Sequence, residues 1–217
     1  DVLRRLTLDA ELIETLAQWR LSRLNRIWPA FAQALARLWL QTMVRRLSSV
    51  EDLQNLIAPA LSRMIKKTSQ FSVSGIEHLD LTQARVYLSN HRDIFLDAAY
   101  ANYALHRMGA RTMSLAIGDN LLSKQWVADL MRLNKSFVVK RNLGGPRALL
   151  AATKLLARFI RQSVAQDHHP IWIAQREGRA KDGRDVTEPA VIKMLTLSRR
   201  QNETPEAVLK SLNIVPL

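Results

Sequence analysis

Residues 84–118, ARVYLSNHRDIFLDAAYANYALHRMGARTMSLAIG, carry the clearest architectural signal in the chain. Two short apolar runs, residues 84–89 and 111–118, are typical of buried strands. Residues 95–108, between them, show apolar positions at helical spacing. A strand, a helix and a second strand in this order predict two parallel strands joined by a helical crossover.

The same alternation runs from residue 71 to the end of the chain. Strands are predicted at residues 71–75, 84–89, 111–118, 135–140, 170–175 and 213–217, and helices at residues 95–108, 119–132, 146–166, 188–200 and 205–212. Pro146 after two glycines, and Thr204 followed by Pro205, are typical of helix starts. We therefore predict an α/β domain over residues 71–217, with a largely parallel central sheet flanked by helices.

A different pattern precedes this domain. Residues 9–66 contain few helix breakers and many regularly spaced leucines, alanines and tryptophans, which predicts two or three amphipathic helices. Pro29 divides them, and Ser49 followed by Asp52 is typical of a further helix start. We predict an N-terminal amphipathic helical region over residues 1–70. Because the chain begins at Asp1 and ends on an apolar run, we also expect a piece of a longer protein, truncated at the C-terminus.

The composition restricts the possible partners. The formal net charge is +13 and the pI is near 10.8, which predicts an anionic partner such as nucleic acid, an acidic membrane or a phosphorylated substrate. The chain has no cysteine, so disulfides, thiolate metal sites and a cysteine nucleophile are excluded.

The best candidate for a membrane span, residues 27–44, has Arg37 near its centre. A central arginine costs roughly 2.5–3.5 kcal/mol on insertion scales, which disfavours spanning. Flanking arginines and tryptophans fit a helix lying on an anionic bilayer. The alternative is a set of helices packed on the core with solvated arginines.

Polar residues follow three of the predicted strands, and strand ends in open α/β sheets face the ligand crevice. The first group is Asn90 and His91, with Asp93 and Asp97 shortly after. A histidine can remove a proton near neutral pH, and a carboxylate on its other ring nitrogen orients it. The alternative is a turn in which Asp93 caps the next helix.

The second group is Lys140 and Arg141, which precede a glycine turn and a helix. Two cations beside a helix N-terminus can bind a phosphate, and the alternative is a solvated basic pair. The third group is Glu177, Gly178 and Arg179. The glutamate could orient a polar substrate while the arginine contacts its phosphate, and the alternative is a surface loop.

Taken together, Asn-His…Asp, Phe-x-x-Lys-Arg and Glu-Gly-Arg in this order resemble the glycerolipid acyltransferase family, in particular enzymes that acylate 1-acyl-glycerol 3-phosphate. The resemblance covers the chain from about Gly75 onward. Its motifs depart from the family pattern, which identifies a divergent member. Five residues instead of four separate His91 from Asp97, so Asp93 is the alternative partner. The third motif lacks one residue before Arg179, so Lys181 is an alternative there.

The resemblance implies that His91 is the general base and that Asp97 orients it. It also implies the following substrate-binding residues: Asn90, Lys140, Arg141, Glu177, Gly178 and Arg179. The implied reaction transfers a fatty acyl group from acyl-CoA or an acyl-carrier protein to the hydroxyl of a glycerol phosphate-type lipid such as lysophosphatidate. No metal or cofactor is implied.

The implied location is cytoplasmic, peripherally associated with the inner face of the membrane, and no nucleic acid is expected as a partner. One alternative is an acyltransferase of the same family that acts on another hydroxylated lipid. The other is a basic module that binds lipid or nucleic acid without catalysis.

Overall fold

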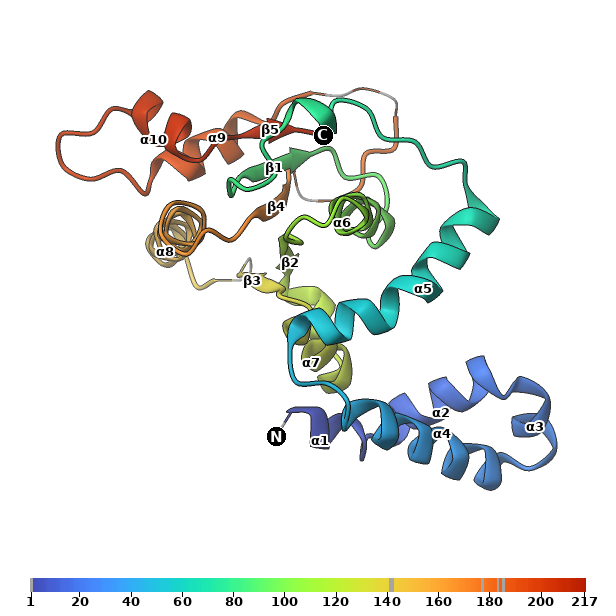
Figure 1. The fold of residues 1–217 in the computed structure, drawn as a ribbon. Helices are drawn as coiled ribbons and strands as arrows, with labels where there is room; N and C mark the ends of the chain where they lie inside the picture. The colour runs from blue at the N-terminus through green and yellow to red at the C-terminus, as the bar shows by residue number, and fades with distance from the viewer. Residues whose placement is uncertain (1, 141–142, 177, 183, 185) are drawn as a thin grey trace. The chain divides into compact units, whose positions relative to one another are not determined.

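The computed structural model describes residues 2–140, 143–176, 178–182, 184 and 186–217 (Figure 1). The helices are α1 (Val2–Leu6), α2 (Ala10–Arg20), α3 (Ser22–Ile27), α4 (Pro29–Val44), α5 (Val50–Thr68), α6 (Leu96–Arg107), α7 (Gln125–Leu133), α8 (Pro146–Ala165), α9 (Pro189–Thr196) and α10 (Pro205–Ser211), with short 3-10 turns η1 (Ile76–His78) and η2 (Asp119–Leu122). The strands are β1 (Val86–Ser89), β2 (Ser114–Gly118), β3 (Phe137–Val139), β4 (Ile171–Ala174) and β5 (Val215–Pro216).

Among the described residues, the strands form one five-stranded sheet in the order β3-β2-β4-β1-β5. Every pairing in it is parallel. The predicted α/β class with a parallel sheet is therefore confirmed. Because the sheet is parallel, the carboxyl ends of all its strands point to one edge, which we call the carboxyl edge.

Helices cover both faces of the sheet, which explains why its central strands are apolar without interruption. Figure 1 shows α8 on one side of the strands and α6 on the other. The side chains of Val86 and Ile171 pack with Ile160 of α8, whereas Tyr87 and Trp172 pack in the cluster on the α6 side. Neighbouring residues of β1 and β4 thus alternate between the two layers.

One predicted strand, at residues 71–75, is wrong. This stretch has no strand assignment, and Gly75 adopts a left-handed backbone with φ of 82° before the η1 turn. The Phe71 ring instead packs on Tyr100 and Tyr103 of α6, with centroids 5.4 and 5.6 Å apart. An apolar run of this length is equally compatible with a loop that anchors one aromatic side chain.

The described chain divides into two compact units. Residues 1–59 and 120–134 form the first unit, and residues 60–119 and 135–217 form the second. The sequence-based boundary at residue 70 stays a prediction. The first unit takes in α7, which lies between β2 and β3 in the sequence.

Polar contacts hold α7 against the start of the chain inside the first unit. Asp129 of α7 is almost fully buried and accepts two hydrogen bonds from the Arg5 guanidinium, at 2.9 and 3.1 Å. These bonds are the main reason why the pKa of Asp129 lies below its usual range. The local helical pattern of α7 could not show this contact, because Arg5 lies more than a hundred residues away.

Small side chains let α2 and α4 pack closely in the same unit. Ala17 of α2 and Ala32 of α4 are fully buried in their shared cluster. Pro29 occupies the first turn of α4, as its place in the sequence predicts. No helix within the described residues is both long enough and apolar enough to cross a bilayer.

Candidate active site

The candidate residues that the structure describes lie at the carboxyl edge of the sheet in the second unit. Asn90 and His91 follow β1, Lys140 follows β3, and the third group follows β4. The parallel register pairs Ser89 with Ala174, so the first and third groups leave neighbouring strands at the same level. The fold therefore brings together two groups that are more than eighty residues apart in the sequence.

His91 contacts Asp97 directly. The His91 Nδ1 atom lies 3.0 Å from Oδ2 of Asp97, and the two side chains are 16% and 20% exposed. The same carboxylate oxygen accepts the backbone N–H groups of Arg92 at 2.7 Å and Asp93 at 3.0 Å. These backbone bonds hold the carboxylate in the first turn of α6, in position to orient the imidazole.

Asp93 has a different set of partners. Its Oδ1 atom accepts the backbone N–H groups of Leu96 at 2.7 Å and Phe95 at 2.9 Å, which is the capping arrangement considered from the sequence. These bonds, that of Leu96 first, hold the pKa of Asp93 below its usual range, and the charges of Arg179 and His91 add to this effect. Asp93 thus starts the helix, and Asp97 faces the His91 ring.

Two contacts that were not predicted also position His91. The indole of Trp172 on β4 meets the His91 ring edge-on, with centroids 5.9 Å apart and planes at 67°. The Ala180 N–H donates to the His91 carbonyl at 2.6 Å. Alternation along β4 could indicate that Trp172 and Ala174 share a face. It could not show that this face includes His91, because the pairing of β1 with β4 is not a local property.

The third group lies on the loop from β4 to α9. Arg179 is exposed, its charge lowers the pKa of Asp93, and the next residue, Ala180, donates its N–H to the His91 carbonyl. Gly178 has φ of 76°, a backbone conformation that residues with a Cβ rarely adopt. The buried Gln175 side chain accepts the Glu188 N–H at 3.0 Å and so ties the two ends of the loop together.

The second group is further from His91. Lys140 is exposed directly after β3. Two strands, β2 and β4, lie between β3 and β1, so three strand spacings of about 4.8 Å put the two strand ends about 14 Å apart. The α8 helix begins at Pro146 as predicted.

Some predicted residues cannot be placed. Arg141 and Glu177 lie outside the described residues, so their part in the site stays a prediction. Lys181, the alternative to Arg179, is exposed on the same loop. Among the described residues, no group of three or more histidine, aspartate or glutamate side chains is arranged to hold a metal ion.

Comparison with known proteins identifies a family. A family model described as Acyltransferase matches residues 70–189, which is more than half of the chain. The matched range contains all three groups of candidate residues in the sequence. None of the curated proteins compared matches the chain.

Proposed function

The chain belongs to the glycerolipid acyltransferase family, and from this premise we propose that it transfers a fatty acyl group from an acyl thioester to the hydroxyl of a glycerol phosphate-type lipid such as lysophosphatidate. Membership supports acyl transfer to a lipid acceptor in general. The observation that carries the more specific proposal is the His91–Asp97 pair, 3.0 Å apart at the carboxyl edge. Acyl-CoA or an acyl-carrier protein would be the donor, with no cofactor.

The proposed chemistry follows from the orientation of the histidine. With Nδ1–H donated to Asp97, Nε2 of His91 is free to remove the proton from the acceptor hydroxyl. The oxygen then attacks the thioester carbonyl carbon, an ester bond forms, and the carbon–sulfur bond breaks. The imidazolium returns its proton to the departing thiolate. The negative charge of Asp97 stabilises the imidazolium, and no covalent acyl-enzyme forms.

Cations at the same edge would bind the acceptor phosphate. Arg179 precedes Ala180, whose N–H bonds to the His91 carbonyl, whereas Lys140 follows β3, whose end lies about 14 Å from that of β1 by strand spacing. If the Lys140 side chain extends along the carboxyl edge, the distance from its ammonium group to the end of β1 becomes comparable to the length of a glycerol phosphate. We propose that Lys140, Arg141 and Arg179 surround the phosphate, while Glu177 and Asn90 hold the glycerol backbone.

The test is a product assay with lysophosphatidate and acyl-CoA. We expect His91→Ala to lose about 10²- to 10⁴-fold in turnover, which is the usual contribution of a general base. His106→Ala, on a half-buried histidine near the end of α6, is the matched control and should retain activity. Turnover near the wild-type level in the His91→Ala protein would disprove the mechanism.

We also propose that the chain binds peripherally to the anionic inner face of the membrane through its N-terminal helices. Trp28, just before α4, and Phe31 and Leu38 along it are among the exposed apolar side chains of this region. Three and seven residues separate them in turn, so they follow one side of the helix. The exposed arginines on α2, α3 and α4 and directly after α4 are Arg20, Arg23, Arg26, Arg37, Arg45 and Arg46. An apolar stripe with arginines around it matches a bilayer interface.

A second candidate is transfer to a different hydroxylated lipid. The observation that favours it is the third motif, in which Arg179 directly follows Gly178 without the usual intervening residue. A displaced cation would change which acceptor fits beside His91. Under this candidate, lysophosphatidate gives no product above the His91→Ala background, while another hydroxylated lipid is acylated in a His91-dependent way.

A further inference from the structure

Exposed apolar side chains gather at the carboxyl edge of the second unit. Ile94 and Phe95, 55% and 57% exposed, immediately precede α6. Val186, 67% exposed, lies on the loop from β4 to α9, and Leu149 and Leu150 lie near the start of α8. We call these five residues the apolar rim. Single exposed apolar residues are ordinary, but a group on one edge marks an interaction surface.

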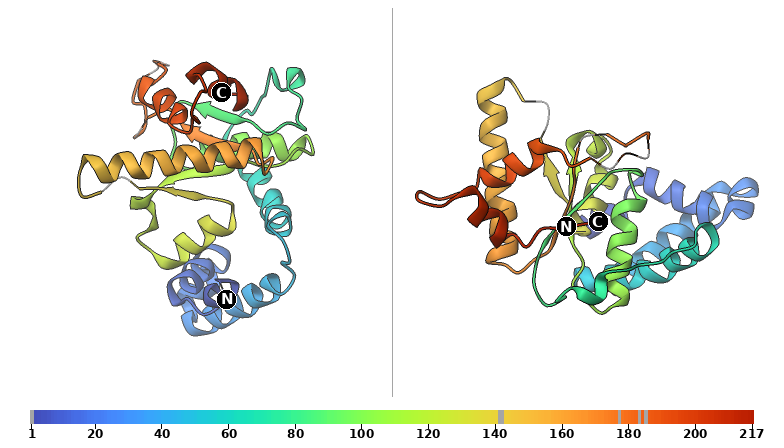
Figure 2. Two further views of the ribbon diagram at one scale, coloured as in Figure 1. Left: turned by 90° about the vertical axis from the view of Figure 1, so that its left-hand side faces the viewer. Right: turned by 90° about the horizontal axis from the view of Figure 1, so that it is seen from above.

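The α8 helix supplies its part of the rim because it is longer than the strands it covers. Twenty residues of helix extend about 30 Å, whereas a strand of four residues extends about 13 Å. The buried residues of α8 begin only at Ala157, so the first half of the helix has none. The left panel of Figure 2 shows this half running past the tips of the strands.

Leu149 is exposed because of its position along α8 relative to the strands, and not because it lies on the solvent-facing side of the helix. It precedes the fully buried Ile160 by eleven residues, which is three helical turns, so both lie on the face turned toward the sheet. Ile160 lies over the strands and is buried, whereas Leu149 lies beyond their tips and is 48% exposed. The core stripe of α8 therefore continues into a region where no strand covers it.

Positive charges surround the apolar rim. The exposed cations on the segments that carry it are Arg92, Lys140, Arg147, Lys154, Arg176, Arg179, Lys181 and Arg184. Among the described residues of these segments, Asp182 is the exposed acid. Asp93 and Asp97 are both engaged by backbone N–H groups. Apolar side chains among cations complement an interface with lipid chains inside and anionic headgroups around them.

We propose that the apolar rim docks onto an anionic lipid bilayer, so that the edge carrying His91 faces the headgroups. This inference rests on the proposed function, because a lipid acceptor and its product can then stay in the bilayer while the hydroxyl reaches His91. The surface is distinct from the stripe on α4, which belongs to the other unit.

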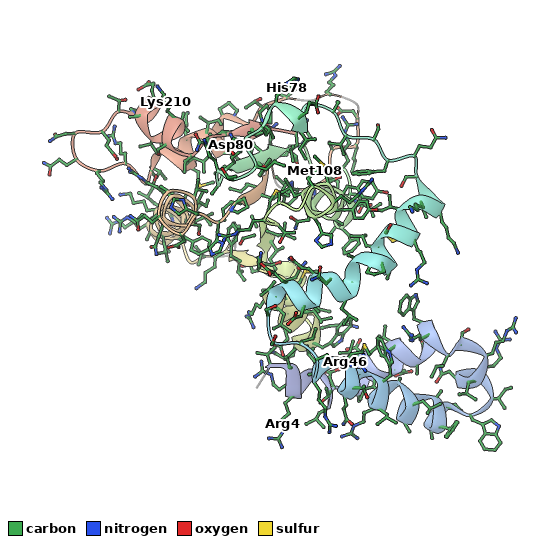
Figure 3. All side chains as sticks on the ribbon, in the orientation of Figure 1. Arg4, Arg46, His78, Asp80, Met108 and Lys210 are labelled. Carbon is green, nitrogen blue, oxygen red and sulfur yellow. The ribbon has the colours of Figure 1, made fainter. Side chains whose placement is uncertain are left out.

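The absence of cysteine makes a site-specific test practical. Four single-cysteine variants are each labelled with an environment-sensitive fluorophore. Leu150→Cys and Val186→Cys probe the apolar rim, and Met108→Cys and Lys210→Cys are the controls. Met108 caps the C-terminal end of α6, which begins after β1, and Lys210 lies near the end of α10, which leads into the start of β5 (both labelled in Figure 3), so neither is at the carboxyl edge. Each labelled protein is mixed with phosphatidylcholine vesicles, with or without phosphatidylglycerol.

We expect blue-shifted emission at positions 150 and 186 with the phosphatidylglycerol vesicles, and unchanged emission at positions 108 and 210. No shift at 150 and 186, or an equal shift at 108, would overturn the proposal. A shift produced by acyl-CoA without vesicles would also overturn it, because the rim would then bind a free acyl chain.

A variant separates docking from catalysis. Leu149→Gln combined with Leu150→Gln should weaken binding to these vesicles about tenfold, the scale expected for losing two half-exposed leucines. Turnover of a short-chain, water-soluble acceptor should stay unchanged. If the vesicles bind through the rim but no acceptor is acylated, the proposed function fails and the docking surface stands. If the double variant binds the vesicles as tightly as wild type and turnover is normal, the docking surface fails and the proposed function stands.

Discussion

Asp93 and Asp97 are chemically identical residues one helical turn apart, and the structure gives them different partners. Asp93 accepts the Phe95 and Leu96 N–H groups, whereas Asp97 faces the His91 ring. The sequence left both carboxylates open because either spacing could place a carboxylate near the ring.

This division predicts different effects of one substitution at the two positions. Asp97→Asn should lower kcat by at least about 10²-fold, because an amide can present its N–H₂ group to the ring and favour the wrong tautomer. Asp93→Asn should keep kcat within a few fold, since asparagine caps a helix as well as aspartate does. Steady-state kinetics of both variants checks this, and equal losses would contradict it.

The Arg161–Glu203 pair predicts how stability depends on pH. Two hydrogen bonds from the Arg161 guanidinium, both 2.5 Å, are the main cause of a Glu203 pKa of about 2, against an ordinary value of 4.5. A carboxylate whose pKa is lowered in the folded state stabilises it above the unfolded pKa and loses that contribution as pH falls through the folded pKa. The pair should therefore stabilise the fold above pH 4.5 and lose this effect progressively toward pH 2.

Thermal unfolding across this pH range measures the effect. Glu203→Gln should flatten the fall in melting temperature between pH 4.5 and 2 relative to wild type. The control is Glu206→Gln, an exposed glutamate in the first turn of α10, which should leave the curve close to wild type. A curve for Glu203→Gln that follows the wild-type one would show that the pair contributes nothing.

Among the elements, α8 combines two structural roles in one helix. Its second half packs Ile160 and Val164 against the sheet, and its first half extends past the carboxyl edge. A substitution in either half should therefore affect a different property.

We expect Ile160→Ala to lower the free energy of unfolding by about 2–5 kcal/mol, because it leaves a cavity in a fully buried position. Leu155→Ala, at a position 69% exposed on the same helix, should change it by less than about 0.5 kcal/mol. Urea denaturation measures both. Similar losses at the two positions would show that the first half of α8 is also part of the core.

The α4 helix predicts a separate effect on membrane binding. Phe31→Ser combined with Leu38→Ser should weaken binding to phosphatidylglycerol-containing vesicles about tenfold, because it removes apolar area that would enter the interface. Leu56→Ser on α5, an exposed leucine of the same unit, is the control. Vesicle sedimentation checks the result, and an equal loss in the control would argue against a role for the α4 stripe.

For the whole molecule, the net charge of +13 predicts a strong dependence on salt. Attraction between the basic surface and an anionic bilayer is screened as ionic strength rises, whereas burial of apolar side chains is not. Binding to phosphatidylglycerol vesicles should therefore weaken steeply with added salt. Binding to pure phosphatidylcholine should be weak and nearly independent of salt. Salt-independent binding to the anionic vesicles would exclude an electrostatic contribution.

Much of the chain could be predicted because the signals are local. The strands β1, β2, β3, β4 and β5 all lie within predicted apolar runs. The hydroxyl of Thr204 accepts the Ala207 N–H at 3.2 Å, and that of Ser49 accepts the Asp52 N–H at 3.1 Å, both at predicted helix starts. Periodicity and capping depend on neighbours within a few residues, so the sequence contains them directly.

Other features depend on residues far apart in the chain. The strand order, the pairing of Ser89 with Ala174 and the packing of Trp172 on His91 all arise when β1 meets β4. The same holds for α7, whose Asp129 is buried against Arg5 of the distant N-terminus. Residues and periods thus set the α/β class, the helix starts and the candidate groups. Only the tertiary structure shows that Asp97 contacts His91 and that Leu149 is exposed. The reason is that strand register and the extension of a helix past a sheet depend on how separate elements pack together.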